Sequence, residues 1–243
     1  MSKFLIALQY WNGDRVAAHE LMELLASTVE RKNPWADIVI YYRHDAQKPD
    51  HDTLERLNEA FDKVYVSHSR SAIQGYPDAC NAMWADLATD AYRKSTESAY
   101  GEPPWAKYKA LFSIEADCCP IASDWLRALS EEWDNATVNV VGFWCNVTNN
   151  RYQKQIGHIN GNMMFALDIV KKRPEIVGTP FGEAWDTWHA QSFKEAGWQH
   201  SGKMISLWNQ PMITKAEFNN LKSSGYVFLH GIKDDSARKL YKP

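Results

Sequence analysis

Short apolar runs alternate with amphipathic stretches along the first part of the chain. The apolar runs are rich in β-branched and aromatic residues, which favours strands, and they cover residues 3–11, 37–43, 63–69, 108–116 and 139–147. Between these runs the apolar residues recur at helical spacing, which predicts helices over residues 14–32, 51–63, 76–94 and 122–133. Strands and helices in alternation predict an α/β fold with a mostly parallel, twisted sheet and helices on both faces.

The alternation weakens in the second half of the chain. Residues 158–174 fit a turn at Asn160-Gly161-Asn162 that leads into a helix ended by Pro174. Residues 181–197 are predicted to be helical, and residues 225–236 to be a short strand running into a loop. Because no repeat or low-complexity stretch divides the chain, we expect a single domain over residues 1–243.

Composition narrows the class of protein. Hydrophobic residues make up 45% of the 243 positions and charged residues 23%, so the chain is typical of a folded globular protein. Four cysteines, two of them adjacent, show no spacing that suits a disulfide framework or structural zinc. No apolar run is long enough for a signal peptide or a membrane span, so we expect a cytoplasmic protein without membrane contact.

Charge and aromatic content indicate which kinds of ligand the protein could bind. The net charge of −3 gives no general sign of nucleic-acid binding. Residues 222–243, however, hold five Lys or Arg against two Asp, a local excess of positive charge. Eleven Trp and eleven Tyr are available to line a pocket that stacks a flat or sugar-like ligand.

Two carboxylates follow the predicted strand at residues 108–116. Residues two apart on an extended backbone point the same way, so Glu115 and Asp117 could face one ligand. Close carboxylates repel unless one is protonated or a cation lies between them, and Mg²⁺ or Mn²⁺ prefers such oxygen ligands. The alternative is an exposed turn in which both carboxylates are solvated.

Glu115-Ala116-Asp117, after an apolar strand and before Cys-Cys-Pro-Ile, resembles the Asp-x-Asp motif of glycosyltransferases with the GT-A fold. In that family the motif holds a divalent metal that bridges the diphosphate of a nucleotide sugar. The resemblance implies that Asp117 is a direct ligand of Mn²⁺ or Mg²⁺. Glu in the first position departs from the motif, so a direct metal bond and a water-mediated or sugar contact stay open for Glu115. His230 and Lys233 fit the family's C-terminal metal ligand and diphosphate-binding base.

A second carboxylate pair, Glu183 and Asp186, lies in the predicted helix at residues 181–197. Side chains three apart share a helix face, and sugar transfer with inversion needs a base that takes the acceptor proton. The resemblance implies that a carboxylate in this part of the chain is that base. We choose Asp186, between Trp185 and Trp188, with Glu183 beside it. The alternative is a helix with a polar face and a Trp stripe in the core.

Polar and aromatic residues cluster where the first predicted strands end. Since ligands of such sheets bind at the carboxyl ends of strands, this edge is expected to hold the nucleotide, and residues 1–120 form the nucleotide-sugar half. The resemblance adds a donor-sugar contact at the Asn-Gly-Asn segment and assigns residues 121–243 to the acceptor. The expected donor-binding residues are Tyr10, Trp11, Asp14, Asp45, Arg70, Asn81, Gly161, Asn162 and Lys233.

The sequence thus favours a metal-dependent, inverting glycosyltransferase, a hexosyl- or pentosyltransferase, that uses a nucleotide diphosphate sugar such as a UDP-sugar. The chain also resembles the small glycosyltransferases with which bacteriophages decorate their own DNA, which implies a location in the host cytoplasm. That resemblance implies the hydroxymethyl group of a modified pyrimidine as acceptor, reached by turning the base out of the stack. The acidic total charge counts against DNA, so a polysaccharide or small-molecule acceptor is the alternative.

Other classes of function are open as well. A metal-dependent phosphoesterase or nuclease also gathers carboxylates and histidines, although a two-metal centre needs more ligands than Glu115, Asp117 and His230. A nucleotidyltransferase is disfavoured because the segment after the first strand, residues 9–17, has one glycine. A carbohydrate-binding module would use the Trp-rich surface, but such modules are usually β-sandwiches.

Overall fold

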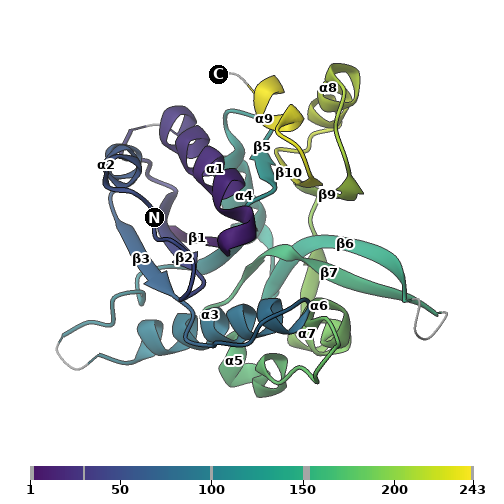
Figure 1. The fold of residues 1–243 in the computed structure, drawn as a ribbon. Coiled ribbons are helices and arrows are strands. Elements are labelled where there is room, and N and C mark those ends of the chain that lie inside the picture. The colour runs from purple at the N-terminus through teal and green to yellow at the C-terminus, as the bar shows by residue number, and fades with distance from the viewer. Residues whose placement is uncertain (1–2, 30, 99–100, 150–153, 242–243) are drawn as a thin grey trace.

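The described part of the chain builds two β-sheets (Figure 1). The computed structural model describes residues 3–29, 31–98, 101–149 and 154–241. The larger sheet has the strand order β3-β2-β1-β4-β7-β6-β8, and the smaller has the order β5-β10-β9. The strands are β1 Phe4–Tyr10, β2 Ala36–Tyr42, β3 Val64–His68, β4 Ala110–Glu115, β5 Cys118–Pro120, β6 Val140–Asn149, β7 Lys154–Phe165, β8 Trp198–His200, β9 Met204–Gln210 and β10 Phe228–Ile232.

Helices cover both faces of the larger sheet, as Figure 1 shows. Helices α1, α2 and α4 lie on one face, α3, α5, α6 and α7 on the other, and α8 and α9 pack beside the smaller sheet. Their bounds are η1 Asn12–Asp14, α1 Arg15–Thr28, α2 His51–Ala60, α3 Asp78–Thr96, α4 Trp125–Asn135, α5 Ile169–Lys172, η2 Pro174–Val177, α6 Trp185–Trp188, α7 Ala190–Ala196, α8 Lys215–Ser223 and α9 Ser236–Leu240. No described helix is long and apolar enough to cross a bilayer.

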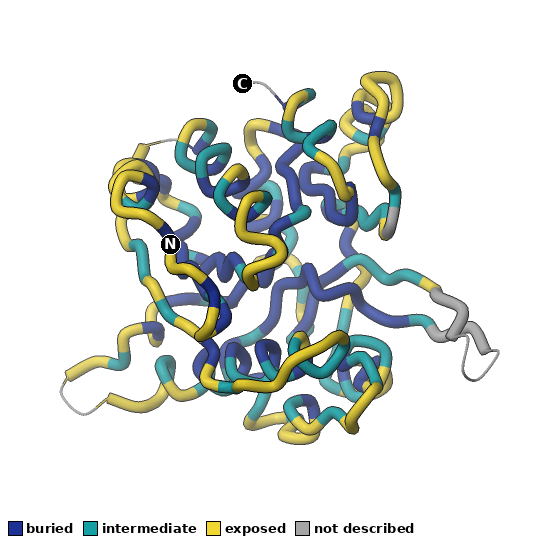
Figure 2. The backbone as a smooth tube through the Cα atoms, viewed as in Figure 1, coloured by how far each residue is buried: buried dark blue, intermediate teal, exposed yellow. Residues whose placement is uncertain are grey.

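The two faces of the sheet follow from side-chain alternation along β1. Ile6 and Leu8 point to the core beneath α1 and α4, whereas Leu5 and Ala7 point to the core beneath α3. Both sets are fully buried, so this central strand is apolar at nearly every position. Figure 2 shows the same buried interior between two layers of partly exposed helices.

Parallel pairing brings several strand ends to one edge of the larger sheet. Strand β1 pairs in parallel with β2 and β4, and β2 pairs in parallel with β3. In this register Gln9 of β1 lies opposite Glu115 of β4, so both strands reach the edge together. Strand β7 then pairs antiparallel to β4 and to β6, and β8 pairs in parallel with β6. The prediction of a mostly parallel sheet with helices on both faces is confirmed.

The prediction of a turn followed by a helix at residues 158–174 was wrong. The segment Asn160-Gly161-Asn162 lies inside β7, and only Ile169–Lys172 is α-helical. Met163 pairs with Ser113 of β4 on one side and with Gly142 of β6 on the other. Pairing with two neighbouring strands outweighs the local turn preference of Asn and Gly, because strand formation depends on tertiary context.

The smaller sheet folds the C-terminal part of the chain back onto the carboxylate segment. Strand β5 begins at Cys118, directly after Asp117, and pairs antiparallel with β10 so that Cys118 lies opposite His230. Next to His230, the register between β10 and β9 shifts at a β-bulge. Gly231 has φ +96° there, and a Cβ at this position would lie 2.9 Å from the Trp208 backbone, so only glycine fits.

Candidate active site

A cavity of about 500 Å³ opens where β1 and β4 end. It lies between the two sheets and helices α3 and α6, since residues of all these elements line it. Its lining is unusually rich in aromatic rings and carboxylates. The lining residues are Gln9, Tyr10, Trp11, Asp14, Ala17, Tyr76, Pro77, Cys80, Asn81, Met83, Trp84, Glu115, Ala116, Asp117, Asn160, Gly161, Ala184, Trp185, Asp186, Trp208, His230 and Lys233.

Glu115, Asp117 and His230 meet at this cavity. Glu115 is the last residue of β4, Asp117 lies in the turn before β5, and His230 comes from β10. The Nε2 atom of His230 is 3.3 Å from Glu115 Oε2 and 3.2 Å from Asp117 Oδ1. One ligand atom from each of the three residues lies within 4.8 Å of the others. The structure therefore brings together the three residues that the sequence suggested as metal ligands.

The donor atoms of this cluster fit a hard divalent cation. Asp117 Oδ1 is buried and accepts no hydrogen bond from the described residues, although it faces His230 Nε2. Ser206 Oγ of β9 lies 3.0 Å from the other ring nitrogen, Nδ1. If Nδ1–H donates to Ser206, the lone pair of Nε2 faces the two carboxylates, as in many metal-bound histidines. Two carboxylates and one imidazole are a donor set suited to Mn²⁺ or Mg²⁺.

Without a cation, the cluster is balanced by protonation and by Lys233. Burial works against the charge on His230, but the two carboxylates outweigh it and raise the pKa of His230 to about 9. Burial likewise opposes the charge on Asp117, yet His230 and Lys233 hold the pKa of Asp117 well below its usual range. Lys233 Nζ lies 2.6 Å from Asp117 Oδ2 and also lines the cavity. A divalent cation that binds the carboxylate oxygens would therefore replace the proton of His230 as the positive charge between them.

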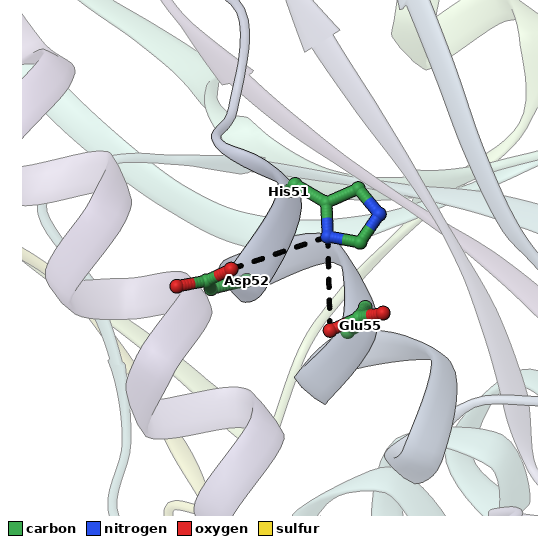
Figure 3. Close-up of side chains that lie close together, drawn as sticks. All are labelled: His51, Asp52 and Glu55. Atoms are coloured by element: carbon green, nitrogen blue, oxygen red, sulfur yellow. Dashed lines mark ion pairs between the residues drawn. The ribbon is translucent and has the colours of Figure 1, made fainter.

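A second group of potential ligands, His51, Asp52 and Glu55, differs in its surroundings (Figure 3). These three residues lie on the first turns of α2, and all are exposed. His51 Nδ1 is 4.0 Å from Asp52 and 3.7 Å from Glu55, and none of the three lines the cavity. Exposed charges at such distances interact weakly. This group serves as a matched control for the cluster in the cavity.

Two residues outside the cavity lining, Asn162 and Arg238, hold the Glu-Ala-Asp turn in place. Asn162 Oδ1 accepts hydrogen bonds from the Glu115 amide at 3.1 Å and from the Cys118 thiol at 2.6 Å. Arg238 of α9 donates to the Ala116 carbonyl and pairs with Glu20 of α1. Asn162 was expected to contact the donor sugar, but it is buried and does not line the cavity. Its observed contacts fix the backbone at Glu115.

Gly161 makes room for the Glu115 side chain. It lies within strand β7 and has no positive φ, so the predicted tight turn is absent. A Cβ placed on Gly161 would come within 2.5 Å of Glu115 Oε1. The absence of a side chain here therefore allows the Glu115 carboxylate to pass over β7 toward His230.

Gly161→Ala should weaken binding of Mn²⁺ because the new methyl group displaces the Glu115 carboxylate from the cluster. Alanine is tolerated in extended backbone, so we expect thermal stability to change little. Calorimetric titration with Mn²⁺ measures the effect, and Gly178→Ala is the control because its Cβ would meet only Glu175 O, at 3.5 Å. Equal Mn²⁺ affinity in both variants and the wild type would exclude Glu115 as a ligand.

The residues after β1 form an aromatic wall of the cavity. Trp11 is 48% exposed and folds over Gly13, where a Cβ would lie 2.3 Å from its ring. Tyr10 is buried and donates its hydroxyl to Gln47 O at 2.7 Å. Asp14 lines the cavity beside them. An exposed ring held by a fixed backbone suits stacking of a base.

Three other residues were expected to bind the nucleotide-sugar donor. Asn81 lines the cavity, but its side-chain amide donates a hydrogen bond to Glu183 O at 2.7 Å and accepts one from the Trp185 amide at 3.0 Å. Asp45 pairs with Arg43, and Arg70 pairs with Asp90 at 2.7 Å. Neither Asp45 nor Arg70 lines the cavity, although each follows a parallel strand, β2 or β3, and the Asp45 carbonyl accepts a hydrogen bond from Asn12 at 3.1 Å.

Asp186 and Glu183 do not share a helix face, contrary to the prediction. The expected helix at residues 181–197 is divided into α6 and α7, and Glu183 precedes α6. Asp186 lines the cavity, and its Oδ1 accepts a hydrogen bond from the Thr187 amide at 2.8 Å. Its Oδ2 lies 3.4 Å from His158 Nε2. Of the two carboxylates, Asp186 alone is among the cavity-lining residues.

The structure adds residues that sequence reasoning missed. Trp208 and Ser206 come from β9, which was not predicted, and Trp208 is 56% exposed at the cavity. Tyr76 before α3 is another exposed ring of the lining. The short apolar run of Met204, Ile205, Leu207 and Trp208 is a signal that could have identified β9. His158 carried no such signal, because its partners lie on other elements.

Comparison with solved structures shows which fold this arrangement represents. The chain superposes on a crystal structure of S. aureus TarS, residues 1–349, with a TM-score of 0.54 and 10% identity over 94% of this chain. It also superposes on the bifunctional glycosyltransferase WbbM, with a TM-score of 0.53 and 10% identity over 94% of this chain. Mouse xyloside xylosyltransferase 1 gives a TM-score of 0.51 and 9% identity over 95% of this chain.

This is a glycosyltransferase fold. The chain covers 98% of the mouse enzyme but 60% of the TarS fragment and 45% of WbbM, so it spans only part of the first two. TarS has also been crystallised with UDP-GlcNAc and with UDP. No known protein-family profile and no curated protein sequence matches the chain. The glycosyltransferase fold thus rests on the three-dimensional arrangement.

Proposed function

We propose that this chain is a metal-dependent glycosyltransferase that moves a sugar from a UDP-sugar to an acceptor hydroxyl with inversion at the anomeric carbon. The cluster of Glu115, Asp117 and His230 in the cavity carries this proposal. The buried Oδ1 of Asp117, beside His230 Nε2 and Glu115, fits a cation, and the position of the cluster at the strand ends of a glycosyltransferase fold fits a nucleotide sugar. We also propose that the protein is cytoplasmic, and that it acts in the host cytoplasm if a phage encodes it.

The donor would lie along the cavity with its diphosphate toward the cluster. Trp11 offers a ring for the base, and Lys233 offers positive charge for the diphosphate. A bound Mn²⁺ or Mg²⁺ supplies electrostatic stabilisation of the negative charge on the departing diphosphate. A neighbour with the same fold, TarS, binds UDP-GlcNAc, which supports the choice of a UDP-sugar.

The acceptor hydroxyl would be activated by Asp186. This carboxylate lines the same cavity as the proposed metal ligands and is partly exposed. It takes the proton as the hydroxyl oxygen forms its bond to the anomeric carbon. The bond from that carbon to the diphosphate oxygen breaks, and its electron pair stays on the diphosphate.

A flat ring is the acceptor that the cavity rim supports best. Tyr76 and Trp208 are exposed aromatic residues of the lining, and such rings stack on bases and sugars. The hydroxymethyl group of a pyrimidine in phage DNA is the acceptor we propose first. The alternative is a polysaccharide or a small molecule, and two ion pairs favour it. Arg238 pairs with Glu20 and Lys239 with Asp235, so part of the positive charge that could bind DNA phosphates is already neutralised.

A phosphoesterase or nuclease with two metals is less well supported. Such a centre needs two cations about 4 Å apart and ligands for both. Among the described residues, the cavity holds one ligand cluster of three residues, and the other cluster is exposed on α2. The cavity therefore favours a single cation.

The experiment that tests the function is a thermal-shift panel of nucleotides and nucleotide sugars, with and without Mn²⁺. A ligand that binds only the folded state raises its stability, by about 2.7 kcal/mol at 100 times the dissociation constant. We expect a UDP-sugar to raise the melting temperature only when Mn²⁺ is present. Absence of a shift with every nucleotide sugar would contradict the proposed function.

A further inference from the structure

His158 is a buried histidine that lies behind the cavity rather than in its wall. It belongs to β7, opposite Cys145 of β6, and is 4% exposed. Its ring reaches toward α6, where Nε2 lies 3.4 Å from Asp186 Oδ2. One side of the Asp186 carboxylate thus faces the cavity, and its Oδ2 lies next to the His158 imidazole.

Both oxygens of Asp186 have partners on the protein side. Oδ1 accepts from the Thr187 amide at 2.8 Å, and Oδ2 faces His158. Two contacts at nearly fixed positions restrict the rotation of the carboxylate. Precise placement matters for a group that must meet a reacting hydroxyl, because small displacements slow such reactions strongly.

The surroundings of His158 favour its charged form. Burial alone would lower the pKa of His158, but Asp186 and Cys145 outweigh burial and raise it to about 10. The Cys145 Sγ atom lies 3.4 Å from Nε2. Two other charged groups near the described part of β7 are Lys194 of α7, which lies over the neighbouring Trp144, and Glu115, which contacts Gly161.

We propose that His158 is a positioning residue that holds the Asp186 carboxylate oriented toward the acceptor hydroxyl. This inference rests on the proposed function, in which Asp186 is the base. The acceptor proton passes to Asp186, and His158 keeps its own proton throughout. The contact of His158 with Oδ2 keeps the carboxylate from rotating away from the cavity, so it stays placed to meet the acceptor hydroxyl.

The separate effects on kcat and KM test this role with His158→Gln, which keeps a polar side chain and removes the charge. The kcat should fall by roughly 10²-fold, because a displaced base meets the reacting hydroxyl poorly, while KM and the Mn²⁺-dependent affinity for the UDP-sugar should stay unchanged. An unchanged kcat, or a fall in kcat together with a loss of donor affinity, would overturn the proposal.

A second measurement is independent of activity. NMR titration of the His158 ring in the wild type should show a protonated imidazole well above pH 7, and the titration should move toward about 6.5 in Asp186→Asn. The same titration in both proteins would overturn the inference. If the wild type transfers no sugar to any acceptor or water, the proposed function and the positioning role fail together, whereas this titration still decides whether the ion pair exists.

The ion pair should also appear in stability measurements. Because folding raises the pKa of His158, its contribution is complete below about pH 6.5 and is lost as the pH rises through about 10. The free energy of unfolding of the wild type should therefore exceed that of His158→Gln most at pH 6.5, and the difference should shrink toward pH 10. Urea denaturation at several pH values measures it, and a constant difference would contradict the ion pair.

Discussion

Asp117→Asn should abolish the Mn²⁺-dependent binding of a UDP-sugar. The Asp117 carboxylate supplies a buried oxygen that lies 3.2 Å from His230 Nε2. The amide that replaces it is neutral and binds a hard cation weakly. Loss of a residue that merely supports a metal ligand costs roughly 10–100-fold in affinity, and loss of the ligand itself should exceed that. Isothermal titration calorimetry with UDP-sugar, with and without Mn²⁺, measures the change.

Asp52→Asn is the matched control for this experiment. Asp52 belongs to the exposed group on α2, which has the same residue types as the cluster in the cavity but does not line that cavity. We expect this variant to bind Mn²⁺ and the donor as the wild type does. Unchanged donor affinity in Asp117→Asn would contradict the metal site, and an equal loss in both variants would point to a general loss of charge.

Asp186→Asn should stop sugar transfer while leaving donor binding intact. An amide has nearly the same shape as the carboxylate but cannot accept the acceptor proton, and removal of such a base typically lowers the rate 10²–10⁴-fold. Asp186 is not among the three clustered ligands, so the affinity for UDP-sugar and Mn²⁺ should not change. Single-turnover transfer and calorimetric binding separate the two effects.

The control for this variant is Asp168→Asn. Asp168 is a partly exposed carboxylate that pairs with Lys172 at the start of α5 and does not line the cavity. Its replacement should leave the rate unchanged within measurement error. Full activity in Asp186→Asn would remove this residue as the base. A parallel loss of donor binding would instead place Asp186 in the donor site.

Together the two variants separate donor binding from chemistry. Asp117 and Asp186 line one cavity but come from different elements, the turn before β5 and helix α6. If the proposed function holds, one variant loses the donor complex and the other forms it without turnover. A phosphoesterase would give a different result, because it would consume the nucleotide diphosphate without an acceptor sugar product.

The sequence by itself determined the frame of the fold and one part of the site. Apolar β-rich runs separated by helical periods are local signals, and the structure has strands at Phe4–Tyr10, Ala36–Tyr42 and Ala110–Glu115 near the predicted places. The carboxyl ends of parallel strands meet at one edge, so carboxylates directly after a predicted strand, Glu115 and Asp117, could be placed at a ligand site. That inference needs only the order of residues along the chain.

Only the tertiary structure decided how distant residues complete the site. Lys233 and Asp117 are 116 residues apart and meet because β10 pairs with β5, a contact that no local period encodes. The segment around Gly161 became a strand because β4 and β6 flank it, and its glycine then accommodates Glu115. His158 reaches Asp186 for the same kind of reason, through the packing of α6 on β7. Strand pairing and packing are set by the global arrangement, so local sequence preference does not fix them.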